Sequence, residues 1–186
     1  MTVGNPFTIT SFFYIVLLVV VYFCKPRIRS DETRLYRNIT ITCLIGVCLS
    51  FGTFYFMANM DKYPFLNFAF ARGYLLFILC FTFFMTQYVF LLAFNGVKYV
   101  KKHYKSVRYL AFWISTFLFL AFGVVSIFLP IEYHNANNLI YSSGPAVEFI
   151  YFITRSMLMI WIVVLSIRFK KIQFKKCLPM IAYVVL

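Results

Sequence analysis

The sequence predicts an all-α protein, a polytopic transmembrane helical bundle with five full spans and the start of a sixth. Of its 186 residues, 63% are hydrophobic and only 12% are charged, whereas soluble domains carry about 25% charged residues. Apolar stretches long enough to cross a hydrocarbon core about 30 Å thick recur along the chain. Too few polar residues remain to cover a soluble exterior, so the exterior is expected to face lipid.

Four stretches contain no charged residue and are each long enough to span once. The first lacks a basic leader and small residues before Lys25, so we expect a retained span rather than a cleaved signal peptide. The four run from the N-terminus to Cys24 with an apolar core from about residue 7, from Asn38 to Met60, from Gly73 to Val97 and from Tyr109 to Ile131.

The last two predicted spans are less regular. The fifth, from about Ala146 to Ile167, contains two charged residues, and the sixth begins at residue 178 and stops after nine residues, at Leu186. Helix carbonyls left without partners halfway across a bilayer are costly. We therefore expect residues 1–186 to form one domain at the N-terminal part of a longer protein.

The basic residues predict the orientation. Loops 25–37, 98–108 and 168–176 alternate with the others and hold five Lys or Arg each, which is fifteen of the eighteen in the chain. The opposite loops carry only Lys62 and Arg72. By the positive-inside rule, the chain is a multi-pass plasma-membrane protein with its N-terminus outside and its basic loops in the cytoplasm.

Two helix starts are also visible in the sequence. Asp31 and Glu32 follow Ser30 and predict a helix that begins before the second span, because acidic residues favour a helix N-terminus. Ser143, Gly144 and Pro145 predict the start of the helix that contains the fifth span.

The net charge of +13 does not indicate nucleic-acid binding, because it is confined to the loops beside the spans. Interleaved Tyr and Lys in residues 98–105 are typical of a segment facing anionic lipid. The predicted partner is therefore the bilayer with its anionic inner leaflet, and the sequence leaves open a homodimer and the identity of any ligand.

No motif predicts catalysis, a metal or a cofactor. His103 and His134 are isolated in loops, and the chain has no phosphate-binding glycine loop, nucleophile elbow, zinc motif or carboxylate pair. Whether the full-length protein is an enzyme is left open. The cysteines, which show no metal-type spacing and are expected to be buried thiols, are Cys24, Cys43, Cys48, Cys80 and Cys177.

Charged residues within spans are the candidate functional residues, because such residues are costly in lipid. Glu148 and Arg155 share a helix face but lie about 10.5 Å apart along the axis, too far to pair. We expect Glu148 to pair with Arg72 at a similar depth, and Arg155 to face the bundle interior near Thr82, Thr86 and Gln87. Two interpretations stay open for these residues, interhelical polar contacts or ligand binding.

Several stretches together resemble the multi-span N-terminal sensor region of membrane-bound histidine kinases from Firmicutes-type bacteria, with related regions ahead of diguanylate cyclase domains. The resemblance implies a signal-receiving membrane half, with a dimerising phosphoacceptor helix and an ATP-binding kinase domain downstream. Glu148 departs from the polar, Asn-like residue that follows GPAV in that family. The stretches, which cover most of the chain, are KPRIRSDETRLYRNITITCLIGVCLSF, RGYLLFILCFTFFMTQYVFLLAF, IYSSGPAVEFIYF and IRFKKIQFKKCLPMIAYVVL.

The expected function is therefore signal sensing in a bacterial two-component system, through an outer pocket between the third and fifth spans that acts inward through the sixth. An alternative is part of a small-molecule transporter or membrane-embedded enzyme, with Arg72, Glu148 and Arg155 along a substrate path. Transporters usually show paired broken helices in two halves, and the sequence shows none. A third interpretation is a membrane-interaction protein without a ligand.

Overall fold

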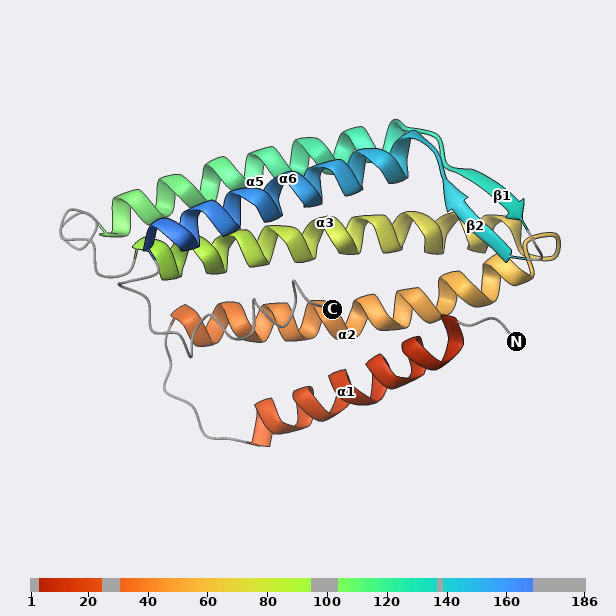
Figure 1. Cartoon of the computed structure of the whole chain (residues 1–186), viewed down its shortest axis with the longest axis horizontal. Coiled ribbons are helices and arrows are strands. Elements are labelled where there is room, and N and C mark those ends of the chain that lie inside the picture. The colour runs from red at the N-terminus through yellow and green to blue at the C-terminus, as the bar shows by residue number, and fades with distance from the viewer. Residues whose placement is uncertain (1–3, 25–30, 95–103, 137–138, 169–186) are drawn as a thin grey trace.

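A computed structural model of the chain describes residues 4–24, 31–94, 104–136 and 139–168. They form a bundle of long helices with a small hairpin at one end (Figure 1). Of the predicted loop 98–108, only residues 104–108 are described, and they are helical instead of forming a loop. The predicted sixth span at 178–186 lies outside the described residues. The elements are α1 (Gly4–Cys24), α2 (Asp31–Ala58), α3 (Pro64–Phe94), α5 (Tyr104–Phe128), β1 (Glu132–Ala136), β2 (Leu139–Ser143) and α6 (Pro145–Arg168).

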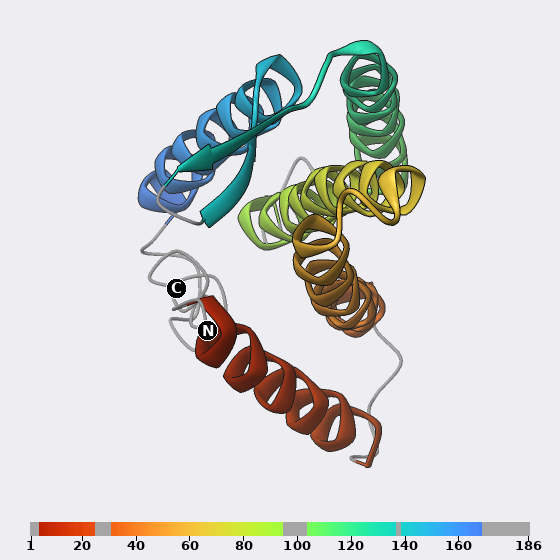
Figure 2. The same cartoon turned by 90° about the vertical axis from the view of Figure 1, so that its right-hand side faces the viewer.

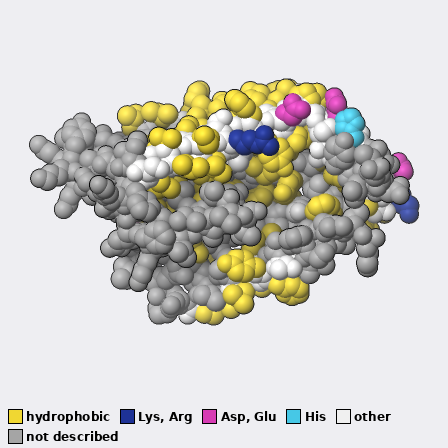
Figure 3. Space-filling view, viewed as in Figure 1, with side chains coloured by type: hydrophobic (Ala, Val, Ile, Leu, Met, Phe, Trp, Pro, Cys, Tyr) yellow, Lys and Arg dark blue, Asp and Glu magenta, His cyan; other side chains and the backbone are white. Residues whose placement is uncertain are grey.

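The prediction of an all-α membrane bundle is confirmed in its coarser form. Four helices, α2, α3, α5 and α6, contain segments long and apolar enough to cross a membrane. Hydrophobic side chains predominate on the described surface over α5 and α6 (Figure 3). Membrane crossing by α1 and by a sixth helix stays a prediction.

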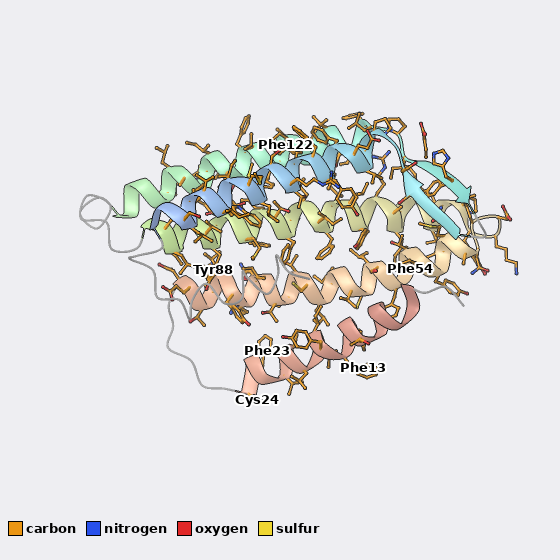
Figure 4. All side chains as sticks on the ribbon, viewed as in Figure 1. Phe13, Phe23, Cys24, Phe54, Tyr88 and Phe122 are labelled. Atoms are coloured by element: carbon orange, nitrogen blue, oxygen red, sulfur yellow. The ribbon has the colours of Figure 1, made fainter. Side chains whose placement is uncertain are left out.

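Helix α3 is the centre of the bundle and packs against α2, α5 and α6 (Figure 2). Helix α1 packs against α2 at the periphery, where the Phe12 and Phe51 rings meet edge to face at 5.8 Å. Its side chains Phe13 and Phe23 are exposed (Figure 4). Two apolar clusters surround α3. The cluster nearer the hairpin is Leu75, Leu79, Phe119, Ala146, Ile150 and Ile153, and the other is Phe81, Met85, Tyr88, Val89, Leu92 and Trp161.

The contact between α2 and α3 depends on small residues. A Cβ atom added to Gly46 would lie 2.1 Å from the Phe77 ring, and one added to Gly52 would lie 2.1 Å from the Phe70 ring. Small residues let membrane helices approach closely, because association there relies on packing and polar contacts rather than on hydrophobic burial. Thr53 adds such a contact by donating to the Phe70 carbonyl at 3.2 Å.

The hairpin at the end of the bundle was not predicted, since the sequence around residues 132–143 was interpreted as a loop. Strands β1 and β2 pair antiparallel with Glu132 opposite Ser143, and β2 contacts both α2 and α6. The sequence signal is short: five-residue strands flank an Asn-rich stretch suited to a turn.

Both predicted helix starts are confirmed. Helix α2 begins at Asp31, with Asp31 and Glu32 in its first turn. Helix α6 begins at Pro145, whose fixed φ suits the first helical position. The residue before it, Gly144, has a φ of 102° and lies so close to β1 that an added Cβ would be 3.1 Å from the Glu132 nitrogen. Strand β2 therefore leads into α6 through a turn that requires glycine.

Candidate functional site

Arg72 lies on α3 near the hairpin end and binds the end of α5. Its Nη1 donates to the Ser126 carbonyl, its Nη2 donates to the Leu129 carbonyl at 2.5 Å, and its guanidinium lies 5.0 Å from the centre of the Phe68 ring. The last carbonyls of a helix lack intrahelical partners and carry the negative end of the helix dipole. Arg72 therefore caps α5 from a neighbouring helix.

The predicted ion pair between Arg72 and Glu148 is wrong. The guanidinium is engaged with the α5 carbonyls instead, which the sequence pattern does not reveal. Glu148 is exposed in the first turn of α6, where a carboxylate is favoured by the positive end of the helix dipole. Each charge thus meets a helix end rather than the other charge.

Three polar atoms near the hairpin end are buried without a hydrogen-bond partner in the described structure: Asn67 Oδ1, Arg72 Nε and Tyr133 Oη. We call these three residues the hairpin cluster. Asn67 is only 1% exposed. Burial raises the pKa of Tyr133, and the positive charge of Arg72 acts on it in the opposite direction, which places the two groups near each other. The cluster offers two donors and an acceptor that the described chain leaves unused.

Strand alternation separates Tyr133 from its neighbours. In a strand, successive side chains point to opposite faces, so Glu132 and His134 share the face opposite to Tyr133. Glu132 and His134 lie 3.5 Å apart and are both exposed. The hairpin therefore presents a polar outer face and directs Tyr133 inward toward Arg72.

A polar seam joins α3 to α6 deeper in the bundle. The Thr82 and Thr154 hydroxyls lie 3.5 Å apart, and the Trp161 indole donates to the Thr86 hydroxyl at 3.1 Å. Thr82 and Thr86 are almost fully buried. On the other side of α3, Gln87 donates to the Ser115 hydroxyl of α5. These are contacts between helices across the core.

The prediction that Arg155 faces the bundle interior is wrong, because its side chain is exposed. Thr82, Thr86 and Gln87, its expected partners, bind Thr154, Trp161 and Ser115 instead. Adjacent residues on a helix are rotated by about 100°. Thr154 faces α3, so its neighbour Arg155 faces away.

Sequence reasoning missed the residues of α6 that do bind α3. Trp161 is 2% exposed, and a buried indole N–H usually finds an acceptor, so its presence in an apolar span was a usable signal for an interhelical contact. Thr154 gave no comparable signal, because its charged neighbour Arg155 was the residue predicted to face the core.

Potential metal-ligating side chains do not gather in the described part of the chain. No group of three or more His, Cys, Asp or Glu side chains lies close enough to hold a metal ion there. The described cysteines Cys24, Cys43, Cys48 and Cys80 are free thiols, but the expectation of burial is wrong for Cys24, Cys48 and Cys80, which are exposed. Cys177 lies outside the described residues. Comparison with protein-family models, curated proteins and solved structures found no match to this chain.

Proposed function

We propose that this chain is the membrane-embedded signal-receiving region of a bacterial signal-transduction protein, a sensor histidine kinase in the plasma membrane with its N-terminus outside. In this proposal α1 is the first of five spans, and a sixth begins at residue 178. The observation that carries it is the position of the hairpin cluster. Its Tyr133 lies on the first strand of a hairpin whose second strand continues through Gly144 directly into α6, so an event at the cluster would act on α6.

The α3–α6 seam supports this role because its contacts can be exchanged. The Thr82 hydroxyl also donates to the Ile78 carbonyl at 2.8 Å, and the Thr154 hydroxyl donates to the Ile150 carbonyl at 2.9 Å. Loss of the contact between the two hydroxyls therefore leaves neither without a partner. A small shift of α6 along α3 is inexpensive at this point, and a sensor needs two states close in free energy.

The basic residues after α6 indicate at which membrane surface a shift of α6 would end. Helix α6 extends to Arg168, where the basic segment 168–176 begins. That segment lies on the cytoplasmic side in the predicted topology. Movement received at the hairpin would therefore be delivered at the inner membrane surface.

The alternative, part of a small-molecule transporter or membrane-embedded enzyme, has less support. Transporter sites usually lie where paired helices are broken near the midplane. The four candidate spans in the described residues are each one continuous helix. The polar groups of the hairpin cluster lie at one end of the bundle rather than along a path through it.

Phosphate transfer in native membranes tests the proposal. Membranes containing the protein as the cell makes it are incubated with radiolabelled ATP, and the protein is expected to gain an acid-labile, base-stable phosphohistidine. Residues 1–186 expressed alone are the control and should stay unlabelled, because they contain no ATP-binding motif. Absence of phosphohistidine from the full protein under all conditions that label a known kinase contradicts the proposal.

A further inference from the structure

Helix α6 presents a second face that no described element covers. Exposed residues recur along it at alternating spacings of four and three, the spacing by which one helix seats against another. We call this face the α6 outer stripe. Figure 3 shows a basic and an acidic side chain within the hydrophobic surface over this helix. The stripe consists of Glu148, Phe152, Arg155, Met159, Ile162 and Ser166.

Arg155 sits near the middle of the stripe and of the apolar segment. The candidate span runs from Pro145 to Ser166, so Arg155 lies ten residues from one end and eleven from the other. At 1.5 Å per residue this is about 15 Å from either end, which makes it hard for the guanidinium to reach the lipid headgroups. A charge at that depth costs about 2.5 to 3.5 kcal/mol on the insertion scale unless it has a partner.

No carboxylate within these 186 residues can serve as that partner. The chain contains five Asp and Glu. Asp31 and Glu32 begin α2 at the end away from the hairpin, and Asp61 and Glu132 lie at the hairpin end (Figure 1). Glu148 is on the same helix as Arg155, about 10.5 Å away along its axis.

We propose that the α6 outer stripe docks a transmembrane helix from outside residues 1–186 that carries a carboxylate level with Arg155. Two turns toward the hairpin end, the same helix would offer Glu148 a basic or amide group. The partner is thus defined by charge complementarity along a helical seam. This inference concerns a partner and not the signal, so it holds whether or not the chain belongs to a kinase.

A second copy of this chain does not satisfy the stripe. Two copies inserted in the same orientation and related by a two-fold axis bring residues of equal depth together. Arg155 would then meet Arg155 and Glu148 would meet Glu148, and like charges in a low dielectric repel strongly.

A depth scan with a synthetic helix tests the proposal. The protein is reconstituted in vesicles with a donor fluorophore, and the probe is an acceptor-labelled Leu/Ala transmembrane peptide carrying one Glu at its centre, one turn away or near its end. Energy transfer should be strongest for the central Glu, with binding about tenfold tighter than for a peptide without Glu. The gain should disappear with a central Gln and in the Arg155→Leu protein, and return in part with Arg155→Lys.

Because Arg155 is exposed, its replacement leaves the core intact, and unchanged energy transfer between fluorophores on α2 and α3 confirms that the variant is folded. Equal binding of all peptides, or a central-Glu gain that survives Arg155→Leu, overturns the proposal. Energy transfer between labelled copies of the protein that is lost in Arg155→Leu also overturns it, since the stripe would then serve a homodimer.

Discussion

The outward faces of α5 and α6 are both exposed, but they differ in chemistry. Every exposed side chain of α5 between Tyr109 and Phe128 is apolar or aromatic, as expected for a helix that meets lipid. The outward face of α6 carries Glu148 and Arg155 among Phe152 and Met159. The two exposed faces therefore suit different surroundings. The α5 face suits lipid, whereas the charged residues of the α6 face need partners on another helix.

The two faces can differ in this way only if both helices cross the membrane. The test of this topology has the largest expected effect. In a chain whose five native cysteines are replaced by serine, single cysteines placed in loops 25–37, 98–108 and 168–176 should all react only with reagents added to the cytoplasmic side. Fifteen basic residues would otherwise have to cross the bilayer. A cysteine in the hairpin is the matched control and should react only from outside. Outside labelling of any one basic loop contradicts the topology.

A charge introduced on the α5 face should be poorly tolerated. Phe117 is 76% exposed near the middle of α5, and the Phe117→Arg change should make insertion less favourable by about 2.5 to 3.5 kcal/mol. The measurement is the fraction of protein recovered from membranes after alkaline extraction, with Phe117→Leu as control. Full recovery of Phe117→Arg would mean that the α5 face also docks a partner.

Removal of the charge from the α6 face should have the opposite effect on membrane insertion. Arg155→Leu should insert at least as well as the natural chain, because it removes a charge from an exposed position in the span. Signalling by the full-length protein should nevertheless change, because the docked helix loses its charged partner. Reduced membrane recovery of Arg155→Leu would show that Arg155 supports the bundle itself, and unaltered signalling would remove the partner from the mechanism.

The sequence was sufficient to locate the helices but not to set all of their ends or their rotation, because α3 begins at Pro64, inside the predicted outer loop that carries Lys62 and Arg72. Long apolar runs and the residues Asp31 and Pro145 predicted where helices lie and begin, because length and capping chemistry act locally. Which side of α6 meets α3 was not predictable, since both sides of a membrane helix are apolar and periodicity no longer distinguishes core from exterior. The predicted inward orientation of Arg155 was wrong for this reason.

Arg72 shows a second limit of sequence reasoning. Its partners are backbone carbonyls at the end of α5, and every residue has a carbonyl, so no side-chain pattern marks them. Charge matching led to Glu148 because carboxylates are the only acceptors visible by residue type. Finding the cap would have required knowing that the α5 end lies beside α3.

The hairpin cluster allows a smaller test on the polar side of the molecule. Tyr133→Phe removes a buried hydroxyl that has no hydrogen-bond partner in the described structure, so it should raise the free energy of unfolding by about 1 to 3 kcal/mol. Denaturation in mixed micelles measures this, with His134→Ala on the exposed face of the same strand as the neutral control. A destabilised Tyr133→Phe would show that the hydroxyl is bound to a partner in the membrane.

The smallest expected effects lie in the α3–α6 seam, where two threonines one turn apart should behave differently. Thr86 accepts from the Trp161 indole at 3.1 Å, so Thr86→Val leaves a buried donor unpaired and should destabilise by about 1 kcal/mol or somewhat more. The Thr82→Val change removes the long contact to Thr154 and the bond from Thr82 to the Ile78 carbonyl of its own helix, but it leaves no side-chain donor unpaired, because the Thr154 hydroxyl keeps its bond to the Ile150 carbonyl. Interhelical contacts of this kind average about 0.6 kcal/mol. The same denaturation assay should therefore rank Thr86→Val below Thr82→Val. The reverse order would mean that the Thr82–Thr154 contact, rather than the indole bond, holds α6 in register on α3, and the exchangeable contact assumed for the signalling shift would be the wrong one.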